Sequence, residues 1–391
     1  MDPQDLINAS AKHLDEIRML RRDLHQHPEL SGDEQRTAAT VAERLRRAGL
    51  TVRTEIGGHG VVAMLGDGEP CLALRADMDA LPLQEQTDLP FASENPGATH
   101  ACGHDFHTAW LVGAALVLQE VGLPRGSVKF IFQPAEEALR GAPGMIAAGV
   151  LDDPSVAAVF AAHVWPEFTA GQIALRPGPN LAAADKFTLT ITGAGSHGAN
   201  PHLGRDPIPV AAEIILALQT IATRRVDPLN PVVVSVCRMD AGTAFNIIPS
   251  VAVLEGTVRT LTPDVQDLVE GAMREIVAGI AAAHGCVGAV DYVRGVPPTI
   301  TDPDMTSLAR QALEEALGPE QVMLQERPSM GAEDFSFFLQ RCPGAVLWVG
   351  STTSGDETPK PLHHPQFVGD EGCLQPAMVG LAAIALAYLS R

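Results

Sequence analysis

Cys71-Leu-Ala-Leu-Arg-Ala-Asp-Met-Asp79 joins a short apolar run to two carboxylates, and it is the stretch that most clearly indicates the architecture of this chain. An apolar run of this length, bounded by polar residues, is typical of a strand buried on both faces of a sheet. Three more runs share this character: Val128–Phe132, Val156–Ala162 and Ala345–Val349. Helical segments such as Thr108–Glu120 separate several of the runs, and this alternation predicts a mainly parallel sheet covered by helices.

The middle of the chain follows a different order of expected elements. Its apolar patterns predict strands and helices in the order β-α-β-β-α-β, over Phe187–Thr192, Ile208–Arg224, Val232–Val236, Val251–Leu261, Val265–Ala283 and Val287–Val293. This is the order of a ferredoxin-like domain. We therefore expect an α/β catalytic domain formed by residues 1–185 and 301–391. A ferredoxin-like α+β domain, residues 186–300, would be inserted between its two parts.

The composition of the chain disfavours some classes of binding partner. The formal net charge of the 391 residues is −20, which disfavours nucleic acid and anionic membranes. The longest apolar stretches, Trp110–Val121 and Ala377–Leu389, are shorter than the roughly 20 residues that cross a bilayer, so we expect buried helices. We expect no signal peptide, and the six cysteines lack the spacing of a disulfide scaffold. These features predict a soluble protein of the reducing cytoplasm.

Side chains that can bind metal follow three of the expected strands. Asp77 and Asp79 come after the first run, Glu136 and Glu137 after the second, and His163 after the third. Because the carboxyl ends of parallel strands meet at one edge of an open α/β sheet, we expect these side chains to converge there.

Two more clusters contain the same residue types. His100-Ala-Cys-Gly-His-Asp-Phe-His107 precedes an expected helix, and His363-His364 lies late in the chain. Taken singly, each cluster has a structural explanation: a turn for Cys-Gly-His, a charged first helical turn for the glutamate pair, a core position for His163, a cap for the aspartates, and a solvated loop for the late histidines. Five such clusters in one α/β domain predict a metal site.

The chemistry that would use such a site is hydrolysis. An unactivated amide needs a nucleophilic water, a polarised carbonyl and a proton shuttle. Two metal ions roughly 3.5–4 Å apart supply the first two, and a carboxylate that is not a full ligand supplies the third. Adjacent glutamates suit this division, because one can bind metal while the other reaches the water.

Several motifs together resemble the hippurate hydrolase and N-acyl-amino-acid amidohydrolase family, which includes auxin-amino-acid hydrolases and some carboxypeptidases. The resemblance covers nearly the whole chain and rests on Leu24–Glu29, Arg75–Pro82, His100–Thr108, Gln133–Glu137, Gly193–His202 and Met330–Phe335. It implies two divalent ions and a lid formed by the inserted domain, which also makes a dimer contact.

The resemblance also implies roles for individual residues. Glu136 would be the general base and acid, and the metal ligands would be Cys102, His104, Glu137, His163 and His363. Asp77 and Asp79 would support these ligands without binding metal. His364 stands where the family often has Asn or Ser, so a second imidazole competes with His363. One thiolate favours zinc, cobalt or nickel over manganese only mildly.

Three residues of the inserted domain resemble groups that contact substrate. His197, in Gly195-Ser-His-Gly198, resembles a lid histidine that steadies the oxyanion, with His202 as its competitor. Asn246 and Arg259 are candidates for holding a substrate carboxylate. The alternatives are a turn histidine for His197, and sheet-edge hydrogen bonding and a surface salt bridge for the other two.

We expect hydrolysis of a small N-acyl amino acid, such as an N-acetyl or N-benzoyl derivative. A dipeptidase or carboxypeptidase would use the same two-metal chemistry, and pocket size would decide between them. A binding protein with a structural metal is disfavoured because Glu136 would be a free base beside a ligand. A nicotinamide-dependent oxidoreductase is disfavoured because no Gly-x-Gly-x-x-Gly motif follows the first strand. A cysteine hydrolase built on Cys102 would work without metal.

Overall fold

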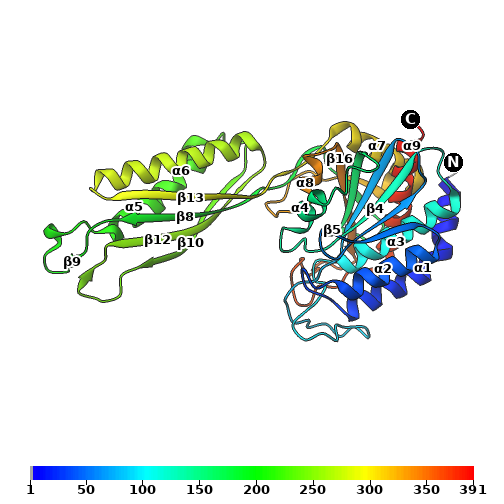
Figure 1. Ribbon diagram of the computed structural model, residues 1–391, viewed down its shortest axis with the longest axis horizontal. Helices are drawn as coiled ribbons and strands as arrows, with labels where there is room; N and C mark the ends of the chain where they lie inside the picture. Colours follow the sequence, from blue (N-terminus) through cyan, green and yellow to red (C-terminus); the bar gives the residue numbers. More distant parts are fainter. Residues whose placement is uncertain (1–2) are drawn as a thin grey trace. The chain divides into compact units, whose positions relative to one another are not determined.

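The computed structural model describes residues 3–391 and divides into two compact units. Unit 1 contains the chain up to Gly178 together with Ile300–Arg327 and Asp334–Arg391, and unit 2 contains Pro179–Thr299 and Pro328–Glu333. Unit 2 is the part coloured from green to yellow in Figure 1. The sequence placed the corresponding borders at 185/186 and 300/301. It did not indicate that Pro328–Glu333 belongs with unit 2, where backbone hydrogen bonds join this segment to residues 180 and 182.

Unit 1 is built on an eight-stranded sheet. The strand order is β1 (Thr51–Ile56), β2 (Gly60–Leu65), β4 (Ser127–Gln133), β3 (Cys71–Asp77), β5 (Val156–Thr169), β16 (Gly344–Thr352), β6 (Ile173–Leu175) and β15 (Val322–Leu324). The four strands predicted from apolar runs, β4, β3, β5 and β16, are mutually parallel and occupy the centre. The predicted mainly parallel sheet is confirmed. The antiparallel neighbours β1, β2 and β6 were not anticipated.

Helices bury this sheet. Strands β3 and β4 are buried along their whole length, as an apolar run without alternation requires. Helices α3 and α9 contact β3, while α1 packs against α3 and α9. The helices of unit 1 are α1 (Pro3–Gln26), α2 (Gln35–Arg47), α3 (His104–Val121), α4 (Gly141–Ala147), α7 (Pro303–Leu317), α8 (Ser336–Leu339) and α9 (Leu374–Leu389).

One segment of unit 1, Glu371–Leu389, is long and apolar enough to cross a membrane. Within its most apolar window, 72% is buried inside the protein. It includes α9, which contacts α1, α3 and α7. The burial matches that of a core helix, as the sequence predicted for Ala377–Leu389.

Unit 2 has its own antiparallel sheet and its own core. The strand order is β10 (Val232–Ala241), β12 (Val251–Thr260), β8 (Ala184–Thr192) and β13 (Val287–Val296). Figure 1 shows α5 (Pro207–Thr220) and α6 (Pro263–Ala283) together on one face of this sheet. Inward-facing residues of β8, such as Phe187, Leu189 and Ile191, form the core with these helices. The predicted ferredoxin-like order is confirmed.

The described chain also contains a π-helical turn and four short strands outside the two main sheets. The expected helix Ile208–Arg224 ends in a π-helical turn, Ile221–Arg225. The remaining strands are β7 (Gly178–Leu181), β9 (Ser196–His197), β11 (Ile247–Ile248) and β14 (Thr299–Thr301).

Candidate metal centre

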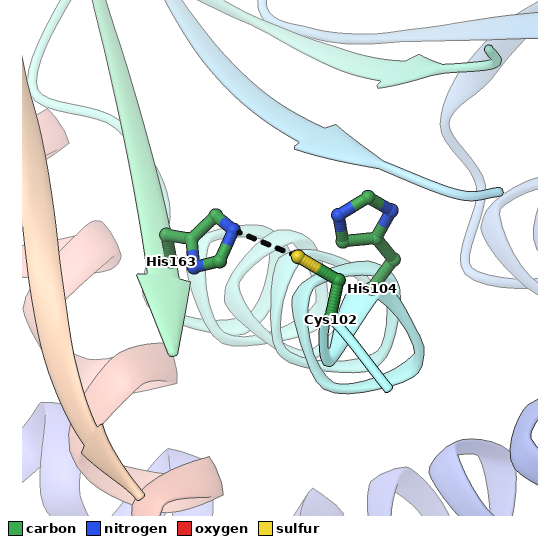
Figure 2. A group of neighbouring side chains, drawn as sticks. All are labelled: Cys102, His104 and His163. Atoms are coloured by element: carbon green, nitrogen blue, oxygen red, sulfur yellow. Dashed lines mark hydrogen bonds between the residues drawn. The ribbon is translucent and has the colours of Figure 1, made fainter. Parts of the chain in front are cut away.

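Four donors gather around one sulfur atom in unit 1. The Cys102 Sγ lies 3.6 Å from His163 Nε2 and 3.3 Å from His363 Nε2. Figure 2 shows the His163 ring turned toward this sulfur, with His104 on its other side. Atoms of Cys102, His104 and His163 lie within 4.8 Å of one another, and so do atoms of Cys102, Glu137 and His363. The structure therefore brings all five predicted ligands together, with Cys102 common to two groups.

A glycine sets the position of the cysteine. Gly103 has φ +79° and directly precedes α3, and a Cβ on it would lie 2.4 Å from the Val164 side chain. A larger residue would therefore push the loop away from β5. The sequence placed His163 just after its strand. It lies instead inside β5, paired with Trp348 of β16, because β5 continues to Thr169.

The hydrogen bonds of two histidines leave one nitrogen of each directed at the cluster. His104 Nδ1 donates to the Asp79 backbone oxygen at 2.8 Å, and His163 Nδ1 donates to the Val164 oxygen at 2.8 Å. An imidazole whose Nδ1 is a donor presents its Nε2 lone pair as a ligand. This is the orientation found in metal-binding histidines.

His107 lies in the same region but serves differently. Its Nδ1 donates to Asp77 Oδ1 at 2.5 Å, and its Nε2 accepts the Val164 N–H at 2.9 Å. Burial lowers the pKa of His107 to about 3, so the ring is neutral. Both nitrogens are engaged, and His107 orients Asp77 rather than offering a lone pair.

The two glutamates lie in a turn between β4 and α4, residues 134–139. They do not form a first helical turn, since α4 begins only at Gly141. The Asp79 carboxylate accepts the backbone N–H groups of Glu136 and Glu137, each at 3.0 Å. Its role in the structure is therefore to hold this turn.

The two glutamate side chains share His104 as a neighbour, since atoms of His104, Glu136 and Glu137 lie within 4.8 Å of one another, but their other contacts differ. Glu137 Oε1 lies 3.4 Å from His363 Nε2 and 3.9 Å from His104 Nε2. Glu136 Oε1 accepts the Asp334 backbone N–H at 3.3 Å. Asp334 belongs to the Met330–Phe335 motif, for which the sequence predicted no role of this residue. Its position next to Glu136 depends on long-range packing and had no local signal apart from the motif.

The pKa shifts of the cluster and its buried atoms without hydrogen-bond partners favour the binding of a cation. Burial raises the pKa of Glu137 to about 7 and holds the pKa of the Cys102 thiol well above its usual value. Within residues 3–391, the buried atoms His104 Nε2 and Glu137 Oε1 have no hydrogen-bond partner. A divalent cation would satisfy both atoms and favour the ionised thiol and carboxylate. The donor set of thiolate, imidazole and carboxylate fits zinc and similar ions.

The predicted substrate residues belong to unit 2. His197 and His202 are both exposed. His197, on β9, accepts the Ala199 N–H at Nδ1, which leaves Nε2 to carry the proton. The exposed Asn246 accepts the Gly198 N–H through its backbone oxygen, so it lies beside His197.

Arg259 lies elsewhere in unit 2. It is near the end of β12, whereas Asn246 is close to the start of this strand at Val251. Eight residues of extended strand span about 27 Å. Arg259 makes no ion pair with any residue of the described chain, which disfavours the surface salt bridge. Asn246 and Arg259 of one chain are not brought together.

Comparisons with known proteins agree with this geometry. Residues 73–387 match the family described as Peptidase family M20/M25/M40. The chain is 41% identical to an N-acetyl-L-cysteine deacetylase of Bacillus subtilis, over 90% of this chain and 83% of the relative. It is 37% identical to the hippurate hydrolase of Campylobacter jejuni, over 96% and 97%. It is also 37% identical to thermostable carboxypeptidase 1 of Saccharolobus solfataricus, over 100% of both chains.

A solved structure gives the same result. A dinuclear metal-binding peptidase of the M20 family from Bacillus subtilis superposes with a TM-score of 0.85 and 36% identity, over 97% of this chain and 99% of that one. The predicted resemblance and enzyme class are thereby confirmed. The chain is a metal-dependent hydrolase that belongs to peptidase family M20/M25/M40.

Proposed function

We propose that this enzyme hydrolyses the amide bond of small N-acyl amino acids, using two divalent ions held by Cys102, His104, Glu137, His163 and His363. The observation that carries the proposal is the convergence of four donors around the Cys102 sulfur, with buried His104 Nε2 and Glu137 Oε1 lacking a hydrogen-bond partner within residues 3–391. Relatives named for the deacetylation of N-acetylcysteine and the hydrolysis of hippurate support the substrate class.

The chain's own residues would divide the reaction between them. When bound, the two ions, which we propose to be zinc, manganese, cobalt or nickel, activate a water and polarise the scissile carbonyl. Glu136 takes a proton from the attacking water and passes it to the leaving nitrogen. The backbone N–H of Asp334 orients its carboxylate. Asp79 holds the turn that carries both glutamates, and Glu137 lies beside the proposed ligand His363.

Unit 2 would complete the site with donors to the substrate. We propose that His197 stabilises the developing oxyanion through Nε2–H, since Nδ1 already accepts a hydrogen bond. Asn246 and Arg259 are proposed to bind the substrate carboxylate. Because Arg259 lies near the end of β12 and Asn246 precedes the start of this strand, we propose that two chains contribute the two contacts to one small substrate.

This separation supports a homodimer. Unit 2 also offers a surface for self-association, since β10 is an edge strand of its sheet. Exposed apolar side chains lie on or near its end, including Met239, Phe245 and Ile247. A two-fold axis would bury such a surface on both copies at once.

A peptidase is the alternative function. The relative named thermostable carboxypeptidase 1 spans the full chain at 37% identity, and it would use the same metal chemistry. We also propose a reducing, cytoplasmic setting, which the six free cysteines support. The charge of −20 supports the exclusion of nucleic acid and anionic membranes as partners.

A substrate panel tests the proposed function. Amino-acid release is measured from N-acetyl, N-benzoyl and indole-acetyl amino acids and from dipeptides, with zinc, manganese, cobalt or nickel added to the metal-free enzyme. We expect the N-acyl amino acids to give the highest kcat/KM. Faster cleavage of dipeptides would favour the peptidase, and hydrolysis by metal-free protein would refute the metal mechanism.

A further inference from the structure

The turn that carries Glu136 and Glu137 has an unusual backbone. Ala135 has φ +54° and Leu139 has φ +55°, so two residues other than glycine are left-handed on either side of the glutamates. Residues with a Cβ disfavour this region, and they keep it only where surrounding contacts hold them. The contacts that hold this turn therefore determine where the two carboxylates point.

Two buried carboxylates hold three successive backbone amides at the start of the turn. The N–H of Ala135 donates to Glu34 Oε1 at 2.8 Å. The next two N–H groups, of Glu136 and Glu137, donate to Asp79. Ala135 is thus the left-handed residue, and Glu34 is the side chain that binds its amide.

Glu34 is not used as its position in the chain would suggest. It directly precedes α2, where an acidic side chain ordinarily accepts the first free N–H groups of the helix. Its side chain makes no such cap. The N–H groups of Arg36 and Thr37 are accepted by Glu29 instead, at 3.0 and 2.7 Å. Glu34 is left to bind the N–H groups of Gly32 and Ala135.

The site of Glu34 is costly for a carboxylate. The residue has no exposed surface, and burial raises its pKa. Its second oxygen, Oε2, is buried without a hydrogen-bond partner in the described part of the chain. A carboxylate placed there loses hydration that its two backbone contacts replace only in part.

We propose that Glu34 is a positioning residue for the proposed reaction, and that it acts by holding the left-handed Ala135 so that Glu136 stays aligned. The proposal rests on the function proposed above. Without the acceptor, the Ala135 amide is unpaired and the backbone can relax out of the left-handed region. Glu136 then moves relative to the attacking water, and a displacement of about 1 Å can reduce rate by about 10²-fold.

Three variants test this role in the metal-loaded enzyme. Glu34→Ala removes the acceptor, Glu34→Gln retains an oxygen in the same place, and Glu29→Ala is the control that removes a carboxylate binding only α2. The readouts are kcat, KM, metal content and hydrogen exchange of peptides that cover residues 131–141. The substrate is the panel compound that the wild type cleaves fastest.

For Glu34→Ala we expect kcat to fall by about 10- to 100-fold, with KM nearly unchanged and both metals retained. The Ala135 amide should exchange faster. Glu34→Gln should restore slow exchange and most of kcat. Glu29→Ala should lower the melting temperature without changing kcat or exchange in this peptide.

Four results would overturn the positioning role: an unchanged Ala135 exchange rate in Glu34→Ala, a kcat within about twofold of wild type, a loss of metal in proportion to activity, or no rescue by Glu34→Gln. Glu136→Gln, measured alongside, separates this proposal from the previous one. Full activity of Glu136→Gln refutes the proton shuttle. A slow Glu136→Gln beside a fast Glu34→Ala refutes only the role of Glu34.

Discussion

Most of the proposed metal ligands of unit 1 are buried, with His363 as the exposed exception, whereas two of the proposed substrate contacts of unit 2 are exposed. In unit 1, Cys102, His104 and His163 are buried, and the core around β3, β5 and α3 fixes each of them. In unit 2, His197 and Asn246 are exposed beside short strands. The contacts within the protein already fix the geometry of a buried donor cluster. An exposed pair takes part only when substrate or another chain approaches it.

Removal of metal should have the largest effect, because it takes away the cations on which the buried cluster depends. Chelation should reduce hydrolysis to background and lower the melting temperature, since ions that bind only the folded state stabilise it. Zinc, cobalt, nickel or manganese should restore both properties. Full activity in protein shown to be metal-free by elemental analysis would contradict the proposal.

Glu136→Gln should distinguish the proposed proton shuttle from the proposed metal ligands. The amide cannot accept the proton of water, so kcat should fall about 10²–10⁴-fold while both metals stay bound. Glu137→Gln is the matched control, and it should lose metal together with activity. If Glu136→Gln loses metal in proportion to its loss of rate, Glu136 is a metal ligand and its assignment as the proton shuttle is wrong.

His197→Ala should test the catalytic role of the exposed histidine of unit 2. A donor to a developing oxyanion contributes about 10²–10³-fold to kcat, so the variant should lose that much while it retains fold and metals. His202→Ala is the control and should remain near wild type. The opposite result for this pair would make His202 the functional lid histidine.

Mixing extends this test to the proposed dimer. If His197 acts across subunits, heterodimers of His197→Ala with Glu136→Gln should regain some active sites. An absence of recovery in verified heterodimers would reject only the cross-subunit geometry.

The pH dependence of stability should also distinguish the two settings. The pKa of Glu137 in the metal-free folded protein is about 7, against an ordinary value of 4.5. The folded state therefore binds this proton more tightly than the unfolded state. The stabilisation from this proton is present below about pH 4.5 and is lost as pH rises to about 7.

Thermal unfolding of metal-free protein between pH 4.5 and 7.5 measures this loss. Glu137→Gln should remove this part of the pH dependence, and His197→Ala should leave it unchanged. A Glu137→Gln variant with the wild-type pH profile would show that other groups cause it.

The smallest expected effect is on cysteine labelling. A metal-bound thiolate is shielded from reagents, so Cys102 should react faster after chelation. Cys237 is exposed in unit 2 and should react at the same rate with and without metal. Equal rates for Cys102 under both conditions would argue against its role as a ligand.

The sequence predicted the architecture well where the pattern was local. Continuous apolar runs identified β3, β4, β5 and β16, since strands buried on both faces need apolar residues throughout. The β-α-β-β-α-β order identified unit 2 because each of its elements has an apolar pattern that can be recognised within a short segment. Strands β1 and β2 were missed because their partners, and thus their burial, depend on the rest of the sheet.

Five clusters of metal-binding residue types were sufficient to indicate a metal site, but they did not reveal the supporting contacts. Cys102 and His363 are 261 positions apart, and nothing local relates them. The same applies to Glu34, which directly precedes α2 but does not cap it. Its actual partner, Ala135, is 101 residues away.

Composition and short-range periodicity were enough to predict the buried central strands, the element order of unit 2, the net negative charge and the residue types that can bind metal. Which nitrogen of His104 and of His163 is free depends instead on tertiary contacts. The same holds for the contact of Glu137 with His363, and for the position of Asn246 beside His197. These properties depend on distances between segments far apart in the chain, which are determined when the sheet and its helices pack.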